Sequence, residues 1–150
     1  MAQYGVVARN VVSMKAEPNA KSEQVSQAVM GETVQVKEQS GEFLLVETED
    51  NYDGWVFSEF VYLCDDENGG AGNRWCVTVS TTPLRVTPEP FGDLVTQLVF
   101  LSRLEGREQE GAYWRVRYPT PQGVAEGYVS IADVEPQEIN HTFDSERAVS

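Results

Sequence analysis

The sequence predicts an all-β protein made of two small β-barrels in tandem, joined by an acidic and glycine-rich linker. Short runs alternate between apolar and polar residues as strands do, and no long helical pattern interrupts them. The chain also aligns with itself at an offset of 70 residues. Between the two copies lies a segment of acidic residues followed by glycines, which has too little apolar content to pack.

The internal repeat is the strongest of these observations. At the offset of 70 residues apolar positions meet apolar positions and charges meet like charges. The aligned pairs include Met14-Lys15 with Leu84-Arg85, Val25-Ser26-Gln27 with Val95-Thr96-Gln97, Gly41 with Gly111, and Val46 with Val116. The second copy then carries three extra residues within 119–123, after which Asp53-Gly54-Trp55-Val56 aligns with Glu126-Gly127-Tyr128-Val129. Such regular matches predict tandem domains of about 60 residues each.

The elements of the first copy follow from its pattern of runs and breaks. A lead-in strand is expected within residues 1–10, and Pro18 begins a long loop because proline lacks a backbone donor. Glycine at 41 and the polar turn 49–51 mark hairpins, and residues 58–60 suit one helical turn. After the lead-in, five short strands are expected, at 11–14, 33–38, 43–48, 52–57 and 61–63. Such strands favour a small, partly open barrel.

These boundaries divide the chain into four segments. Residues 1–63 form the first expected domain, and residues 75–136 form the second. The linker is expected at 64–74, and residues 137–150 form a tail or a linker towards a further domain.

The net charge of −13 limits the partners of this chain. Binding to nucleic acid depends on Lys and Arg at the phosphates, so a nucleic acid partner is not expected. The charge disfavours anionic membrane surfaces equally, and no apolar run approaches the ~20 residues of a membrane span. An acidic surface is compatible with cationic or amine-bearing ligands.

The cysteines and the N-terminus give three further expectations. Cys64 and Cys76 make no disulfide framework, and with one histidine they are too few and too scattered for a zinc site. We therefore expect no cofactor and no metal. No basic segment followed by a long apolar one opens the chain. If Met1 is the native start we expect a cytoplasmic protein, and if a leader has been removed we expect the periplasm or cell envelope.

The long loop, the central hairpin and the closing strand Asp50-Asn51-Tyr52-Asp53-Gly54-Trp55-Val56 together resemble a bacterial SH3 (SH3b) domain. Both copies fit, over roughly residues 4–136, and the first fits better. The segments 14–18, 23–27 and 50–56 resemble the first SH3b domain of NlpC/P60 peptidases, the γ-D-glutamyl-L-diamino-acid endopeptidases that cut cell-wall stem peptides. Members of that family carry two such modules ahead of a papain-like cysteine peptidase domain.

The resemblance implies a substrate-binding site on the first copy. In the resembled enzymes, a Glu before a Pro and a Tyr before the Gly-Trp pair recognise the free amine of an N-terminal L-alanine, and the matching residues here are Glu17 and Tyr52. Trp55 is included as a third binding residue, with the barrel rim or core as the alternative. Glu17 and Tyr52 have an alternative too, as ordinary loop residues on an acidic surface. The second copy has Thr87 and Ala125 instead, so no amine site is expected there.

The predicted function is a non-catalytic murein-peptide-binding module that positions the stem peptide for an NlpC/P60 catalytic domain, in cis or in trans. No Asp-Cys-Ser-Gly-like motif of that domain occurs in this chain. The alternative is a stand-alone SH3-like module for protein–protein interaction. An independent enzyme is disfavoured, because Cys64 with His141 as its base would lack a third orienting residue and an oxyanion motif.

Overall fold

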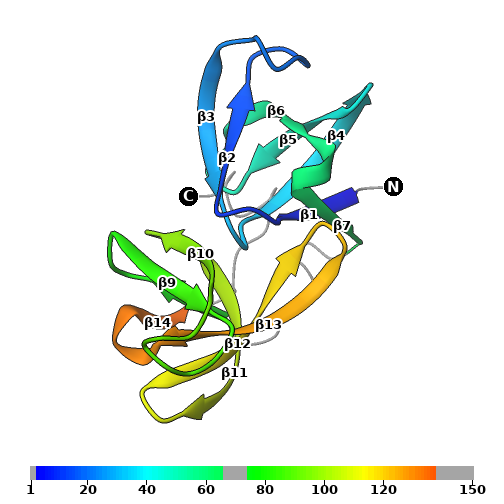
Figure 1. The fold of residues 1–150 in the computed structure, drawn as a ribbon. Helices are drawn as coiled ribbons and strands as arrows, with labels where there is room; N and C mark the ends of the chain where they lie inside the picture. Colours follow the sequence, from blue (N-terminus) through cyan, green and yellow to red (C-terminus); the bar gives the residue numbers. More distant parts are fainter. Residues whose placement is uncertain (1–2, 66–73, 138–150) are drawn as a thin grey trace, which may run out of the picture.

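Two antiparallel sheets of seven strands each make up the protein in the computed structural model, which describes residues 3–65 and 74–137. Figure 1 shows the first sheet in the upper part of the molecule and the second in the lower part, both strongly curled. The first sheet holds strands β1 to β7 in the order β3-β2-β6-β5-β4-β1-β7, and the second holds β8 to β14 in the matching order β10-β9-β13-β12-β11-β8-β14. The all-β fold class is therefore confirmed, and no α-helix occurs in the described parts of the chain.

The strands of the first sheet are β1 (Gln3–Val7), β2 (Val11–Lys15), β3 (Gln24–Val29), β4 (Thr33–Ser40), β5 (Phe43–Thr48), β6 (Asp53–Phe57) and β7 (Val61–Cys64). Those of the second are β8 (Arg74–Val77), β9 (Thr81–Arg85), β10 (Leu94–Val99), β11 (Arg103–Glu110), β12 (Tyr113–Thr120), β13 (Gly123–Ser130) and β14 (Val134–Gln137). Single 3-10 turns, Ser58–Phe60 and Ile131–Asp133, precede the last strand of each sheet.

The first sheet has more strands than the five short runs predicted after the lead-in. The lead-in strand β1 is a full member, because it pairs with β4 on one side and β7 on the other. Strand β3 pairs with β2 at the sheet edge, where Val25 is exposed and Ala28 is buried. The predicted linker at 64–74 and the tail at 137–150 fall almost entirely outside the described residues.

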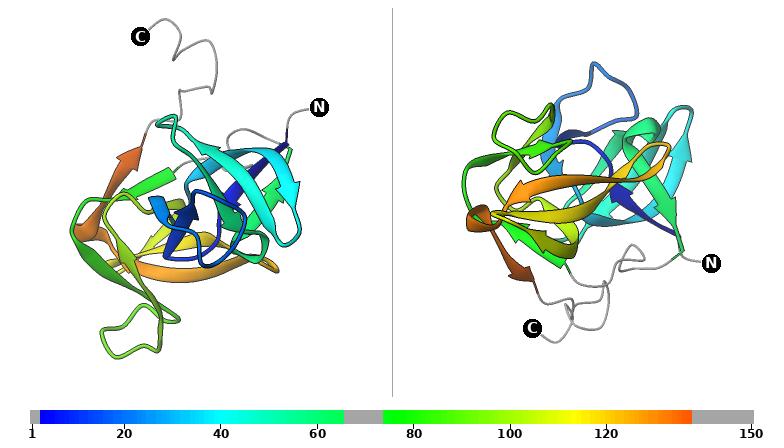
Figure 2. Two further views of the ribbon diagram at one scale, coloured as in Figure 1. Left: turned by 90° about the horizontal axis from the view of Figure 1, so that it is seen from above. Right: turned by 60° about the horizontal axis from the view of Figure 1, so that its bottom comes forward.

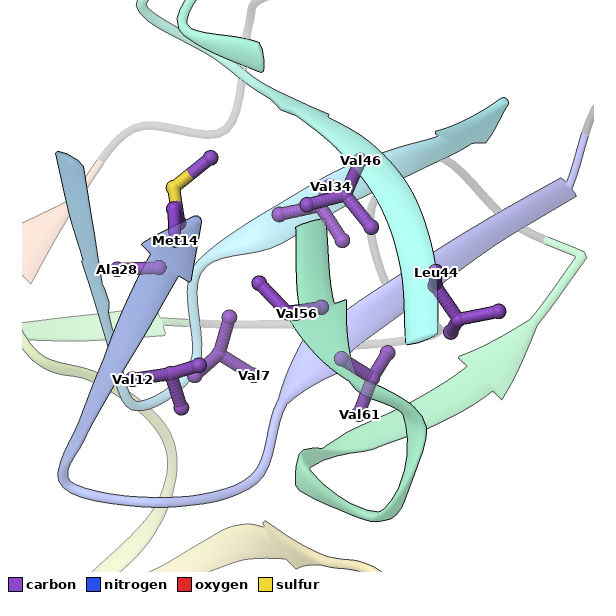
Figure 3. Packing of buried hydrophobic residues seen from close by; sticks show 9 residues of the cluster. All are labelled: Val7, Val12, Met14, Ala28, Val34, Leu44, Val46, Val56 and Val61. Carbon is purple, nitrogen blue, oxygen red and sulfur yellow. The ribbon is translucent and has the colours of Figure 1, made fainter. Parts of the chain in front are cut away.

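Alternation of side chains builds the core of the first sheet (Figure 3). In β5, for example, Leu44, Val46 and Thr48 are buried while the residues between them are only half-buried. Full burial of each such aliphatic side chain stabilises the fold by about 1.5–3 kcal/mol. The cluster consists of Val7, Val12, Met14, Ala28, Val34, Leu44, Val46, Val56 and Val61.

The glycine of each closing strand lets that strand approach its neighbour. A Cβ on Gly54 would lie 2.7 Å from the Cβ of Met14. At the aligned position, a Cβ on Gly127 would lie 3.1 Å from the carbonyl oxygen of Arg85 and 3.1 Å from Leu84. The repeated Gly-aromatic-Val pattern therefore has a packing cause in both sheets.

The turn between β3 and β4 forms a contact between the sheets. Met30 is buried within the apolar core of the second sheet, and its carbonyl oxygen accepts a hydrogen bond of 2.8 Å from the backbone N–H of Arg103. Gly31 has a φ of +83°, and a Cβ there would overlap the carbonyl group of Arg103. The side chain of Arg74 is buried at this contact and donates to the carbonyl oxygen of Gly31 at 3.1 Å.

A long hairpin forms the other contact between the sheets. Strands β12 and β13 have eight residues each, against six and five for β5 and β6, because the three extra residues of the second copy lie at this hairpin. Figures 1 and 2 show the hairpin reaching towards β1 and β7. There it encloses a cavity of about 100 Å³. The cavity lining includes Val6 and Tyr62 of the first sheet and Tyr118, Pro119 and Val124 of the hairpin.

Replacing Gly31 with alanine should destabilise the protein by more than the cost of a left-handed residue alone. That cost is about 1–2 kcal/mol, and the overlap with Arg103 adds to it. The control is Gly41→Ala, since Gly41 has a φ of +60° but a Cβ added there would have no atom within 4 Å. Denaturant unfolding of both variants measures the difference, and equal losses would refute a steric role for Gly31.

Leu101 aligns with Gly31 and keeps a left-handed backbone, with a φ of +74°, although it has a side chain. Its side chain is exposed, so its removal takes away little buried apolar surface. We expect Leu101→Gly to raise the free energy of unfolding by about 0.5–1 kcal/mol, because the strain is relieved. A lower midpoint in chemical denaturation would contradict this expectation.

Candidate functional site

Glu17 lies in the loop that joins β2 to β3. The loop is closed by a hydrogen bond of 3.0 Å from the N–H of Ala16 to the carbonyl oxygen of Glu23. Inside it, the N–H of Glu17 donates to the Ser22 hydroxyl at 2.9 Å, and its carbonyl oxygen accepts from the N–H of Asn19 at 2.8 Å. These bonds fix the backbone of Glu17, whose side chain is exposed.

Tyr52 ends the tight turn between β5 and β6. The turn folds onto Thr48: the Thr48 N–H donates to the Tyr52 carbonyl oxygen at 2.9 Å, and the Tyr52 N–H donates to the Thr48 hydroxyl at 3.2 Å. Asn51 supplies the left-handed position, with a φ of +69°, and its N–H donates to the Thr48 carbonyl oxygen at 3.0 Å. The Tyr52 side chain is 59% exposed.

The strand register brings the Glu17 loop and the Tyr52 turn to one end of the first sheet. Strands β2 and β6 run antiparallel, and Lys15 lies opposite Trp55. The loop that follows Lys15 and the turn that precedes β6 therefore leave the sheet at the same end. The sequence alone did not show that these two segments share one end of the sheet.

Trp55 has a different position from the other two predicted residues. It lies between buried Gly54 and buried Val56, so its side chain is on the opposite face of the strand from the core, where it is half-buried. The core alternative for Trp55 is thereby wrong, and the residue lies on the outer face close to the Tyr52 turn.

Acidic side chains surround this end of the sheet. Lys37 forms ion pairs with Glu47 at 3.0 Å and Asp53 at 3.5 Å. The hydrogen bond to Glu47 is the main cause that raises the pKa of Lys37, which stays charged at neutral pH. Among the described residues, Glu17 takes part in no ion pair. Its carboxylate is therefore available to a cation from solution.

The second sheet repeats the geometry without the functional groups. Its loop between β9 and β10 is closed in the same way, by a hydrogen bond of 2.8 Å from the Val86 N–H to the Asp93 carbonyl oxygen. Thr87 takes the place of Glu17. Ala125 takes the place of Tyr52 and lies within β13, opposite Tyr118, instead of at a turn.

A group of charged residues beside the Tyr52 turn was not foreseen from the sequence. Glu49, within the turn, forms an ion pair with Arg103 of the second sheet. Burial raises the pKa of the nearby Glu32 carboxyl, which accepts the Val29 N–H at 3.1 Å; Arg103 acts against that rise. The only sequence signal was the alignment of Arg103 with Thr33, a charged residue where the first copy has a neutral one.

The remaining polar groups offer little for catalysis. Neither Cys64 nor Cys76 is part of a disulfide, and burial raises the pKa of Cys76, so Cys76 favours the less reactive protonated form. His141 lies outside the described residues. Within 3–65 and 74–137 no three His, Cys, Asp or Glu side chains gather to hold a metal ion, and no helix is long and apolar enough to cross a membrane.

Comparisons with known proteins agree with this fold. Residues 10–62 match the family model described as "Bacterial SH3 domain". No curated protein matches the chain closely enough to name as a relative. The structure is similar to the crystal structure of an NlpC/P60 family protein from Bacillus cereus ATCC 10987, with a TM-score of 0.70 and 14% sequence identity, over 89% of this chain and 56% of that one.

Two further similarities are weak. NlpC2 and NlpC1 from Trichomonas vaginalis each align with a TM-score of 0.39, at 11% and 15% identity. The alignments cover 94% and 99% of this chain and 51% of each of those chains. This chain thus spans little more than half the length of the solved structures it matches.

The comparisons relate the first sheet to bacterial SH3 domains, because residues 10–62 of that sheet match the family model. The molecule as a whole shares its fold with part of an NlpC/P60 family protein, at an identity too low to transfer more than the fold.

Glu32→Gln tests the electrostatics beside the site. Because burial raises the folded-state pKa above the ordinary value of 4.5, the folded protein binds this proton more tightly than the unfolded chain does. The wild type therefore loses stability as the pH rises from the ordinary pKa of 4.5 through the raised pKa of Glu32 in the folded state. Glu32→Gln should be more stable than wild type at pH 7, and the gain should vanish below pH 4.5.

Unfolding free energies measured between pH 3 and pH 8 check this expectation. Glu38→Gln, on an exposed part of β4, is the control for loss of one carboxylate. A gain for Glu32→Gln that grows towards low pH would show that the sign is wrong.

Proposed function

We propose that the protein is a tandem SH3b unit that binds a murein stem peptide through its free N-terminal amine and presents it to an NlpC/P60 cysteine peptidase domain. The peptidase domain acts in cis or in trans. The unit itself contributes recognition and not chemistry. The proposal extends the bacterial SH3 match of residues 10–62 and the shared fold to a ligand and a partner.

The observation that carries the proposal is the convergence of the Glu17 loop and the Tyr52 turn. A carboxylate in no ion pair and an exposed phenol leave the same end of the first sheet, on backbones held by hydrogen bonds. An ammonium group suits this pair, because a charge-assisted hydrogen bond to a carboxylate is roughly twice as strong as a neutral one. The aromatic ring of Tyr52 adds a cation–π contact, worth about 0.5–2 kcal/mol. Trp55, on the outer face nearby, contributes apolar surface for the peptide.

The second sheet acts as a second SH3b module without an amine site. Its strand order matches that of the first sheet, which supports the tandem arrangement. Thr87 and Ala125 provide neither charge nor a phenol at the matching positions. Ligand binding is therefore assigned to the first module alone.

A second candidate function is a stand-alone module for protein–protein interaction. The second sheet favours it, because its loop between β9 and β10 exposes two large apolar side chains, Val86 and Phe91, and Phe91 is 95% exposed. Exposed apolar patches of this kind mark interaction sites in many soluble proteins. The two functions differ in whether a small amine-bearing peptide binds.

Calorimetric titration with L-Ala-γ-D-Glu-diaminopimelate separates them. Glu17→Gln should weaken binding about 10- to 100-fold, since it removes a hydrogen bond to a charged group. Tyr52→Phe should weaken it by roughly 2- to 10-fold, the value of a neutral hydrogen bond. Acetylation of the peptide amine should have an effect at least as large as Glu17→Gln.

The matched control is Glu89→Gln, an exposed carboxylate in the corresponding loop of the second sheet, which should bind like wild type. Equal affinities for the free and the acetylated peptide would refute the proposed amine-binding site. Absence of binding both alone and with an NlpC/P60 peptidase domain added would favour the interaction module.

A further inference from the structure

The turn that carries Tyr52 is tied to the second sheet by one largely buried ion pair. Glu49 is the first residue of that turn, and Arg103 is the first residue of β11. Their side chains are only 10% and 16% exposed. Salt in solution screens such a pair far less than it screens a pair on the surface. The contact is therefore a persistent link between the two sheets.

The turn behaves as one unit, so holding Glu49 also holds Tyr52. Thr48 is buried and makes hydrogen bonds with both Asn51 and Tyr52, as described above. Glu49 and Tyr52 are only three positions apart, and the hydrogen bonds to Thr48 close the backbone of the turn into a ring. A displacement of the Glu49 side chain thus moves the Tyr52 backbone with it.

Arg103 is itself well anchored. Its backbone N–H donates to Met30, and its strand pairs with β8 through Cys76. The guanidinium also acts on the neighbouring carboxylates: it lowers the pKa of Glu32, whereas Glu49 and Asp50 raise it. Without Arg103, the repulsion among the carboxylates of Glu32, Glu49 and Asp50 would be less well compensated.

The internal repeat indicates that this link serves the first sheet only. The residue aligned with Arg103 in the first copy is Thr33, which has no charge to offer. The hairpin aligned with the Tyr52 turn is the long one at 119–123, which ends without a tyrosine at the matching position. Arg103 therefore acts on the candidate site of the first sheet, and its own sheet has no such site.

We propose that Arg103 is a positioning residue for the amine site: the second sheet holds the Tyr52 turn in its binding geometry through the ion pair with Glu49. The ligand part of this inference rests on the proposed function above. The second sheet then has a role in recognition, although it has no residues equivalent to Glu17 and Tyr52. Pre-organisation of this kind improves affinity by lowering the cost of ordering the site.

Hydrogen exchange of the backbone amides of Asn51 and Tyr52 tests the link without any ligand. Arg103→Gln and Glu49→Gln should each speed exchange at these two amides by about tenfold or more, because the turn opens locally. The control is Arg115→Gln, which removes an arginine whose ion pairs with Glu108 and Glu110 lie within the second sheet. Exchange at Asn51 and Tyr52 should be unchanged in that control.

The double variant Glu49→Arg/Arg103→Glu keeps the ion pair with reversed charges. It should restore slow hydrogen exchange at both amides. This rescue distinguishes a specific link from general loss of stability, which the single variants also produce. Equal exchange in Arg103→Gln and Arg115→Gln would overturn the proposal. Hydrogen exchange in the double variant that is as fast as in the single variants would overturn it as well.

Titration with the free-amine peptide then separates this inference from the proposed function. Arg103→Gln should weaken binding by about 3- to 10-fold, with less effect than Glu17→Gln, because it loosens the site without removing a ligand contact. If the wild type binds no peptide but the exchange results hold, the positioning of the turn stands and the ligand is wrong. If the wild type binds and Arg103→Gln binds equally well, the positioning role is refuted.

Discussion

The absence of a side chain at Gly31 is the constraint on which the arrangement of the two sheets depends. A Cβ there would overlap the Arg103 carbonyl group, so only glycine allows the β3–β4 turn to lie on β11. Once the turn is seated, Met30 enters the core of the second sheet and the backbone of Arg103 is bonded to it. The guanidinium of Arg103 then reaches Glu49. One small residue thus determines the geometry of a contact that extends from one apolar core to the edge of the candidate binding site.

Most local features of the fold could be predicted from the sequence because they depend on neighbouring residues. Strands at 33–38 and 43–48, the glycine turn at 41 and a tight turn at Asn51 all appear in the structure where the pattern placed them. Burial alternates along β5 as predicted, but in β4 Thr33 and Val34 are both buried, so the expected single buried face is not seen there. The edge strand β3 was not among the predicted strands, since it buries little apolar surface: Ala28 is buried, whereas Val25 is exposed. For the candidate site, the motif located Glu17 and Tyr52, but only the register of Lys15 with Trp55 shows that their loops share one end of the sheet.

Contacts between the sheets could not be predicted, since they join residues that are far apart and follow no periodic pattern. The ion pair of Glu49 with Arg103 spans 54 positions of the chain. The three extra residues at 119–123 were visible in the alignment, but their length alone did not say that the hairpin would reach β1 and β7. Departures from an internal repeat were nevertheless informative. Two positions where the copies differ in character, Thr33 against Arg103 and Gly31 against Leu101, lie at or beside the contact.

The exchange of glycine for leucine at position 101 has a consequence for growth by duplication. In solenoid proteins each unit docks on the next through the same surface, and an atypical unit at the end acts as a cap. Leu101 keeps the left-handed backbone of the docking turn but adds the side chain that Gly31 must lack. A third unit placed on the second as the second is placed on the first would collide with it. The first sheet can therefore dock a neighbour through this turn, whereas the second sheet cannot do so in the same way.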